Sequence, residues 1–302
     1  MGNLWDKELV IGREEAAELI AGQFPNLSPV KIEALDEGFD NTVYLVNEAY
    51  VFRFPRRKVA TVLIEREARF LPELPDLGDI ATPRPQFIGK PTAGYPWPFL
   101  GYGFFDGKKA YNLSDSLRTQ SAKRLATFLK ELHHTPVRPE WSVPADYLHR
   151  TDIEERLPKF CDRLEEIKRL GDTSLYQRLK EYQDTLTFPK EKSYTPRLVH
   201  GDLHLKNVVI SEASGLIKAV IDWGDVHMGD PAVDLSFVYS FLPEAGRVVF
   251  FDAYGEVSTN TKMKAQFVSL YISVLLFLYA KDQKNEPLIH AAKDSVTRAL
   301  EV

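Results

Sequence analysis

The sequence has almost no cysteine and no long apolar run. Cys161 is the only cysteine among 302 residues, which excludes a disulfide within the chain and a zinc site built from several cysteines. The first residues show no basic segment followed by an apolar one, so we expect no secretion signal. The most apolar stretch, residues 267–280, is shorter than the ~20 residues that cross a bilayer. It predicts a buried core helix, and we expect a cytoplasmic protein with no membrane partner.

A surplus of either charge is also missing. The formal net charge is -5 and the isoelectric point is about 5.9, whereas a nucleic-acid partner requires a basic face. We therefore predict no nucleic-acid partner. Hydrophobic residues make up 44% of the chain and charged residues 27%, which is the usual balance of a globular protein with a sizeable core. The composition does not distinguish a monomer from a dimer.

The first third of the chain is patterned for a β-sheet. Runs of β-branched and aromatic residues predict three strands, and the short connections between them make the strands antiparallel. One helix precedes these strands, a second helix follows them, and a further strand ends near residue 104. The predicted segments are helix 13–24, strands 30–35, 42–46 and 50–54, helix 58–74 and strand 98–104.

The rest of the chain is patterned mostly for helices. Residues 121–133 and 152–187 have helical spacing, and two short apolar strands, 208–210 and 217–221, flank a turn. The sequence therefore predicts an α+β fold in two lobes. We place the N-terminal lobe at residues 1–102 and the C-terminal lobe at 103–302. The hinge would lie near 102–107.

The segment "LVHGDLHLKNVVI", residues 198–210, allows two interpretations. His200, Asp202 and His204 alternate, so on an extended segment they would share one side and could bind a metal in a hydrolase. Alternatively, Asp202 and Asn207 form the pattern D-x-x-x-x-N, and Asp222 follows after two strands. The metal interpretation leaves Asn207, Asp222 and the whole first third unexplained.

The second interpretation has a specific chemistry. Phosphoryl transfer requires a carboxylate that orients the attacking hydroxyl and accepts its proton, and oxygen ligands that hold Mg²⁺ against the nucleotide phosphates. Asp202 would be the catalytic carboxylate, and Asn207 and Asp222 would bind the metal. The short segment from Asp222 to the next helix contains no A-P-E motif, so a protein substrate is not expected.

These motifs resemble the aminoglycoside phosphotransferase family, the small-molecule branch of the protein-kinase-like fold. In this family the loop reads H-G-D-x-x-x-x-N, the metal aspartate lies in I-D-[WF], and G-D-P-x-x-D-[LI] follows. The sequence has "HGDLHLKN" at 200–207, "IDW" at 221–223 and "GDPAVDL" at 229–235. The resemblance covers roughly residues 30–240 and implies a bilobal fold with an N-terminal antiparallel sheet and a mostly helical C-terminal lobe.

The resemblance also implies the reaction and its cofactors. The donor would be ATP or GTP with Mg²⁺, and the acceptor would be a small-molecule hydroxyl, first of all on an aminoglycoside-type antibiotic, which would confer antibiotic resistance. A macrolide, or a small alcohol such as homoserine, methylthioribose or choline, is the alternative acceptor. A metallohydrolase and a catalytically weak nucleotide-binding regulator are the alternatives of other classes.

The resemblance assigns the nucleotide site to the first third of the chain. In "EGFDNTVYLV" the phosphate loop would use one glycine and one asparagine. The basic residue on the next strand is Arg where the family usually has Lys, and a glutamate on the following helix would pair with it. The hinge would supply a tyrosine behind the purine and backbone groups beside it. The residues are Gly38, Asn41, Arg53, Glu67, Tyr102, Gly103 and Phe105.

Several neighbouring residues are expected to have structural roles. In the kinase-like fold His200 would brace the catalytic loop, His204 would be a bystander, and Asp230 and Asp234 would cap the helix that opens at Pro231 and bind the loop. The acceptor pocket has no distinctive pattern. Its candidate acids are Asp225, Asp230, Glu244 and those of "RTDIEERL".

Overall fold

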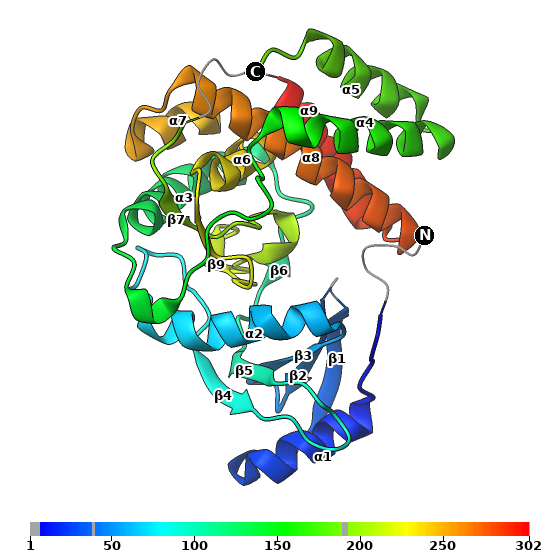
Figure 1. Ribbon diagram of the computed structural model, residues 1–302, viewed down its shortest axis with the longest axis vertical. Coiled ribbons are helices and arrows are strands. Elements are labelled where there is room, and N and C mark those ends of the chain that lie inside the picture. Colours follow the sequence, from blue (N-terminus) through cyan, green and yellow to red (C-terminus); the bar gives the residue numbers. More distant parts are fainter. Residues whose placement is uncertain (1–6, 38–39, 189–192, 302) are drawn as a thin grey trace.

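The computed structural model describes residues 7–37, 40–188 and 193–301 and folds into two lobes (Figure 1). The smaller lobe holds a five-stranded antiparallel sheet in the order β1-β2-β3-β5-β4. Its strands are β1 (Ile32–Glu37), β2 (Asn41–Val46), β3 (Tyr50–Pro55), β4 (Pro85–Gly89) and β5 (Phe99–Gly103).

Two helices cover this sheet, α1 (Arg13–Gln23) and α2 (Lys58–Phe70). Alternation along β3 turns Phe52 and Phe54 toward α1, where they join a buried apolar cluster with Ile20. The other face of β3 carries Arg53. Helix α2 lies between the sheet and the larger lobe (Figure 1), so Arg53 faces the cleft between the lobes.

The larger lobe is mostly helical, with short strands that shape its loops. Helix α6 is buried along its whole length, and α8 packs against both α6 and α9. The helices are α3 (Asp115–His134), α4 (Ile153–Arg169), α5 (Thr173–Thr185), α6 (Ala232–Phe241), α7 (Glu244–Tyr254), α8 (Thr259–Asp282) and α9 (Glu286–Leu300). The strands are β6 (Lys108–Lys109), β7 (Arg197–Val199), β8 (Val208–Ile210), β9 (Ile217–Val220) and β10 (His227–Gly229).

Helix α8 confirms the buried core helix predicted for residues 267–280 and extends it at the N-terminal end. By length and composition alone it could cross a membrane, but 72% of its most apolar window is buried inside the fold. This burial is typical of a core helix, which is apolar on most sides because it packs against neighbours on most sides.

The predicted α+β, bilobal class and the antiparallel strands are confirmed. Strand β4 was not predicted, because its proline-rich surroundings are typical of a loop. Residues 71–80 follow α2 but contribute Leu71, Leu74, Leu77 and Ile80 to the apolar core of the larger lobe. We propose that the boundary between the lobes, with its hinge, lies near residues 102–107.

Candidate active site

The loop between β7 and β8 holds the H-G-D-x-x-x-x-N motif, and the buried histidine of this motif braces the loop. His200 is fully buried. Its Nδ1 accepts a hydrogen bond from the backbone N–H of Asp202 (3.2 Å), and its Nε2 donates to the backbone oxygen of Ile221 (3.1 Å). The ring also packs edge-on against the buried Trp223. Both ring nitrogens therefore serve the loop, and burial lowers the pKa of His200, which keeps the ring neutral.

Gly201 occupies a position that no other residue fits. Its φ is +85°, a left-handed conformation that side chains disfavour. A Cβ atom here would lie 2.3 Å from the backbone oxygen of Asp225 and 2.7 Å from Nδ1 of His227. The tight turn at Gly201 points the next residue, Asp202, into the cleft.

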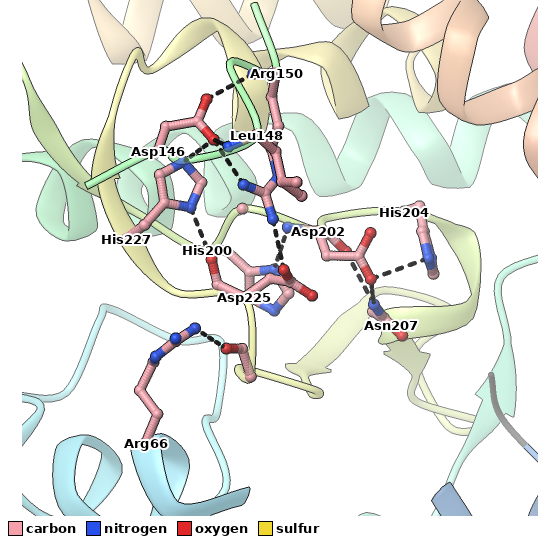
Figure 2. Close-up of polar contacts among 12 residues, drawn as sticks. Arg66, Asp146, Leu148, Arg150, His200, Asp202, His204, Asn207, Asp225 and His227 are labelled. Carbon is pink, nitrogen blue, oxygen red and sulfur yellow. Dashed lines mark hydrogen bonds and ion pairs between the residues drawn. The ribbon is translucent and has the colours of Figure 1, made fainter. Parts of the chain in front are cut away.

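Asp202 and Asn207 are held together by the loop they share (Figure 2). The Asn207 Nδ2 donates to the backbone oxygen of Asp202 (2.9 Å) and to its Oδ2 (3.1 Å). His204 lies beside them, with its Nε2 3.4 Å from the Asp202 Oδ2. Burial would raise the pKa of Asp202, but the charge and hydrogen bond of the neighbouring His204 foremost outweigh burial and hold this pKa below its usual value. His204 is therefore not a bystander.

Asp222 enters the same cleft from the end of β9. Its φ of +66° is left-handed, a conformation that Asp tolerates better than most residues. The next residue, Trp223, is fully buried and donates from Nε1 to the backbone oxygen of Val220 (3.0 Å). The tryptophan fixes this turn, while the Asp222 side chain is 45% exposed in the cleft.

Asp234 on α6 accepts hydrogen bonds from the backbone of the loop between β7 and β8. Its carboxylate accepts from the backbone N–H groups of His200 (2.8 Å) and Gly201 (2.9 Å) and from Nε2 of His133 (3.1 Å). Complete burial would raise the pKa of Asp234, but these hydrogen bonds, that of His133 foremost, hold this pKa below its usual value. His133 is held in turn by the hydroxyl of Tyr254, 2.7 Å from its Nδ1. The prediction that Asp234 binds the loop is confirmed.

Arg53 links the sheet to the second motif. Its Nη1 donates to both carboxylate oxygens of Glu67 (2.7 and 2.6 Å), and its Nη2 is bound to Oδ1 of Asp222. Arg53 and Glu67 are buried. Burial raises the pKa of Glu67 to about 7, although the Arg53 guanidinium opposes this shift. The structure therefore brings Arg53 and its predicted partner, Glu67, into contact.

A cavity of about 210 Å³ opens between the sheet and this loop. Most of the predicted site residues line it together: Asn41, Arg53, Tyr102, Phe105, Asp202, Asn207 and Asp222. The Oδ1 of Asn41 is buried and has no hydrogen-bond partner among the residues that the structure describes. Glu67 does not line the cavity but reaches it through Arg53. Gly38 lies outside the described residues.

The segment proposed as the hinge is only partly available to a ligand. Tyr102 is buried at the back of the cavity, as expected. Gly103 is not in the lining; it pairs with Tyr50 in the sheet. The N–H of Phe104 already donates to the backbone oxygen of Ala49 (2.8 Å). Among residues 103–105, which were expected to offer backbone groups to the purine, Phe104 and Phe105 border the cavity.

A second cavity, of about 350 Å³, lies on the other side of Asp202. The two cavities share Asp40, Asp202, His204 and Asp225 in their linings. Among the candidate acids for an acceptor pocket, Asp225 lines this cavity, whereas Asp230 is buried in an ion pair with Lys264 (2.9 Å). Asp152 and Glu154 line a neighbouring smaller cavity.

The sequence pattern missed Arg150, which reaches Asp225 from a distant segment (Figure 2). Its Nη2 lies 2.5 Å from Oδ1 of Asp225, and its Nη1 lies 2.7 Å from Oδ1 of Asp146. No local pattern marks a pair separated by 75 residues. Burial and the nearby Asp202 raise the pKa of Asp225 to about 7, although Arg150 opposes this shift.

The site does not favour a hydrolytic metal centre. Residues 7–37, 40–188 and 193–301 contain no group of three or more His, Cys, Asp or Glu side chains that could hold a metal ion. Both nitrogens of His200 are used by the backbone. The alternating His200, Asp202 and His204 therefore do not form a set of metal ligands.

The architecture and the loop define a kinase-like phosphotransferase fold, and comparisons with known proteins identify the family. Residues 31–265 match the model of the phosphotransferase enzyme family, so the chain belongs to that family. It is an enzyme of the small-molecule kinase class, since solved structures similar to it are kinases of this kind.

Three solved structures illustrate the likeness. The GDP and kanamycin complex of an APH(2'') enzyme is 27% identical, with 94% of this chain and 97% of that chain covered and a TM-score of 0.68. The GDP complex of aminoglycoside 2'-phosphotransferase-IIIa is 25% identical, covers 96% and 99%, and has a TM-score of 0.71. Macrolide 2'-phosphotransferase type I is 20% identical, covers 95% and 98%, and has a TM-score of 0.55, which shows the shared fold alone.

Proposed function

We propose that this protein transfers the γ-phosphoryl group of ATP or GTP to a hydroxyl of a small molecule. The observation that carries the proposal is the position of Asp202, which lines both cavities. A carboxylate at this junction can meet a hydroxyl that enters from one side and a phosphate held on the other. Such positioning supplies most of the catalysis in phosphoryl transfer.

Asp202 is the proposed catalytic carboxylate. The acceptor hydroxyl gives its proton to Asp202 while its oxygen forms a bond to the γ-phosphorus. The bond from the γ-phosphorus to the bridging oxygen breaks, which leaves a phosphate monoester and a nucleoside diphosphate. Because the pKa of Asp202 lies below its usual value, the carboxylate is ionised at neutral pH and can accept a hydrogen bond from the acceptor hydroxyl, which orients it. The hydrogen bond from Asn207 holds the carboxylate in place.

Asn207 and Asp222 are the proposed ligands of Mg²⁺. The amide nitrogen of Asn207 is turned to Asp202, which leaves its oxygen for a metal. The Asp222 carboxylate is half exposed in the same cavity. Oxygen donors of this kind suit Mg²⁺, which keeps several of its ligands for water and phosphate. When bound, the ion supplies charge neutralisation at the β- and γ-phosphates.

The larger part of the nucleotide site is proposed for the sheet lobe. Arg53 is permanently charged and, at the cavity wall, can bind phosphate oxygens through two N–H groups. Gly38 and Asn41 would turn the chain around the phosphates. Tyr102 and Phe105, which line the cavity, would border the purine, whereas Gly103, which was also expected there, is paired in the sheet. The complete set of Asp202, Asn207 and Asp222 argues against a regulator that has lost catalysis.

The acceptor class is the finer part of the proposal. The resemblance favours an aminoglycoside-type antibiotic, and the neighbour that holds kanamycin at 27% identity supports it. We assign the second cavity, of about 350 Å³, to the acceptor and call it the acceptor cavity. Its wall on α8 is apolar, which favours a second candidate of macrolide type. Antibiotic resistance and a cytoplasmic location, where ATP and GTP are made available, belong to the same proposal.

Nucleotide turnover with Mg²⁺ tests the proposal. ATP and GTP are compared across a panel of aminoglycosides, macrolides and small amino alcohols, with the Asp202→Ala variant as control. We expect one acceptor class to stimulate turnover in the wild type and not in the variant. Turnover that is the same in both proteins would refute the role of Asp202.

A further inference from the structure

One wall of the acceptor cavity is an apolar face of α8. The side chains that form it are spaced as neighbours along one side of a helix. Tyr271, Ile272 and Leu275 are only half-buried, although the opposite face of α8 packs in the core. The wall consists of Val268, Tyr271, Ile272, Leu275 and Leu276, together with Leu148 from the segment before α4. A ligand that covers this wall would remove apolar surface from water.

The charges of the same cavity cancel. Asp40, Asp202 and Asp225 are its three carboxylates, and Arg57, Arg150 and Arg156 are its three guanidinium groups. Each carboxylate has a cationic or histidine neighbour. Asp40 is bound by Nε of Arg57 (2.9 Å), Asp225 by Arg150 (2.5 Å), and Asp202 lies 3.4 Å from His204.

The carboxylates of this cavity are poorly placed to neutralise a polycationic ligand, because they already have partners. Each ammonium group that leaves water needs a carboxylate of its own. In this cavity Asp225 already binds Arg150, whose second N–H group is fixed by Asp146. The Arg156 guanidinium donates to the backbone oxygen of Leu148 (2.5 Å) and lies over the Tyr271 ring, so a third positive charge stands at the apolar wall.

We propose that the acceptor is a hydroxyl compound with a large apolar body and no more than one positive charge, and that Arg150 excludes polycations by neutralising Asp225. This inference rests on the proposed phosphotransfer activity. The apolar body covers the α8 wall, and the hydroxyl reaches Asp202 at the junction of the two cavities. The cavity volume of about 350 Å³ is within the range for drug-sized ligands.

The first test compares three acceptors with the wild-type protein, ATP or GTP, and Mg²⁺. Erythromycin has an apolar body and one amine, kanamycin is a polycation, and homoserine is small and polar. We expect erythromycin to gain a phosphoryl group, seen by mass spectrometry, with a kcat/KM at least about tenfold above the other two, a difference of about 1.4 kcal/mol. A preference for kanamycin or homoserine would overturn the inference.

Failure of this inference can be separated from failure of the proposed function. Slow nucleotide hydrolysis that depends on Asp202, together with no binding of erythromycin by calorimetry, would overturn the acceptor class and leave the phosphotransferase standing. Nucleotide hydrolysis and acceptor phosphorylation that are both unaffected by Asp202→Asn would overturn the proposed function itself.

Leu275→Asp and Arg150→Gln, each compared with a control variant, locate the residues that select the acceptor. Leu275→Asp puts a charge on the α8 wall and should raise the KM for erythromycin about tenfold or more while kcat changes less. Val248→Asp, on the exposed surface of α7, is the matched control and should behave as the wild type. Arg150→Gln frees Asp225 and should move the ratio of erythromycin to kanamycin turnover toward kanamycin, whereas Arg150→Lys keeps the charge and the ratio. An unchanged ratio in Arg150→Gln would overturn the role of Arg150.

Discussion

Replacement of Asp234 by asparagine should both destabilise the fold and impair transfer, although the two side chains have the same shape. In the wild type Oδ2 accepts from the backbone N–H of His200 and from His133, and Oδ1 accepts from the backbone N–H of Gly201. An amide has only one oxygen. In either orientation its NH₂ group therefore faces at least one buried N–H donor.

The magnitude follows from these contacts. A buried donor without an acceptor costs about 1–3 kcal/mol, and hydrogen bonds that lose an ionised acceptor weaken by about half. With one donor orphaned and the others weakened, we expect the free energy of unfolding to fall by about 2–5 kcal/mol. The donors of His200 and Gly201 directly precede Asp202, so kcat should fall more than nucleotide affinity.

Urea unfolding and steady-state kinetics check this prediction. Asp252→Asn, an exposed change on α7, is the control for loss of a charge. A loss below about 1 kcal/mol in Asp234→Asn, with wild-type kcat, would refute the argument that this carboxylate fastens the loop.

Three further predictions concern the residues around the cleft. Arg53→Met leaves the buried Glu67 unpaired and should lower the free energy of unfolding by about 3–5 kcal/mol and abolish nucleotide binding. Arg53→Lys should retain part of the stability and part of the nucleotide affinity. Equal unfolding curves for the two variants would contradict the pairing of Arg53 with Glu67. Gly201→Ala forces a left-handed alanine against the Asp225 backbone and should cost about 2 kcal/mol or more, which thermal unfolding would detect. Burial raises the pKa of Asp225 to about 7 in the folded protein. In the unfolded chain this carboxyl has its ordinary, lower pKa, so between the two pKa values the folded state binds a proton that the unfolded state has released. The free energy of unfolding therefore falls as the pH rises toward 7. The melting temperature of Asp225→Asn relative to wild type should therefore increase from about pH 5 to about pH 8, and a constant difference would contradict it.

The parts of the site that could be predicted from the sequence lie close together along the chain. Asp202 and Asn207 share one loop, and Asp222 ends the hairpin that follows. Short connections leave such residues few relative positions, so their spacing carries the geometry. The Arg53–Glu67 pair was predicted from the family resemblance, and β3, which leads directly into α2, carries Arg53 close to the helix that carries Glu67.

The acceptor cavity could not be predicted in the same way. Arg150 meets Asp225 across 75 residues, and the face of α8 comes from a third segment. An apolar helix has the same sequence pattern whether its second face packs in the core or lines a cavity. The contact of His204 with Asp202 is also decided by the fold, because a histidine two residues from a carboxylate in a loop can face that carboxylate or turn away from it. The structure places His204 beside Asp202.

The rate of phosphoryl transfer by the Asp202→Asn variant, measured beside its affinity for nucleotide, tests the role of Asp202 most directly. We expect kcat to fall by about 10²–10⁴-fold, the usual contribution of a positioned base. We expect the nucleotide Kd to stay close to that of the wild type, because Arg53 and Asp222 still line the cavity. Transfer at the wild-type rate would show that Asp202 is not the catalytic carboxylate.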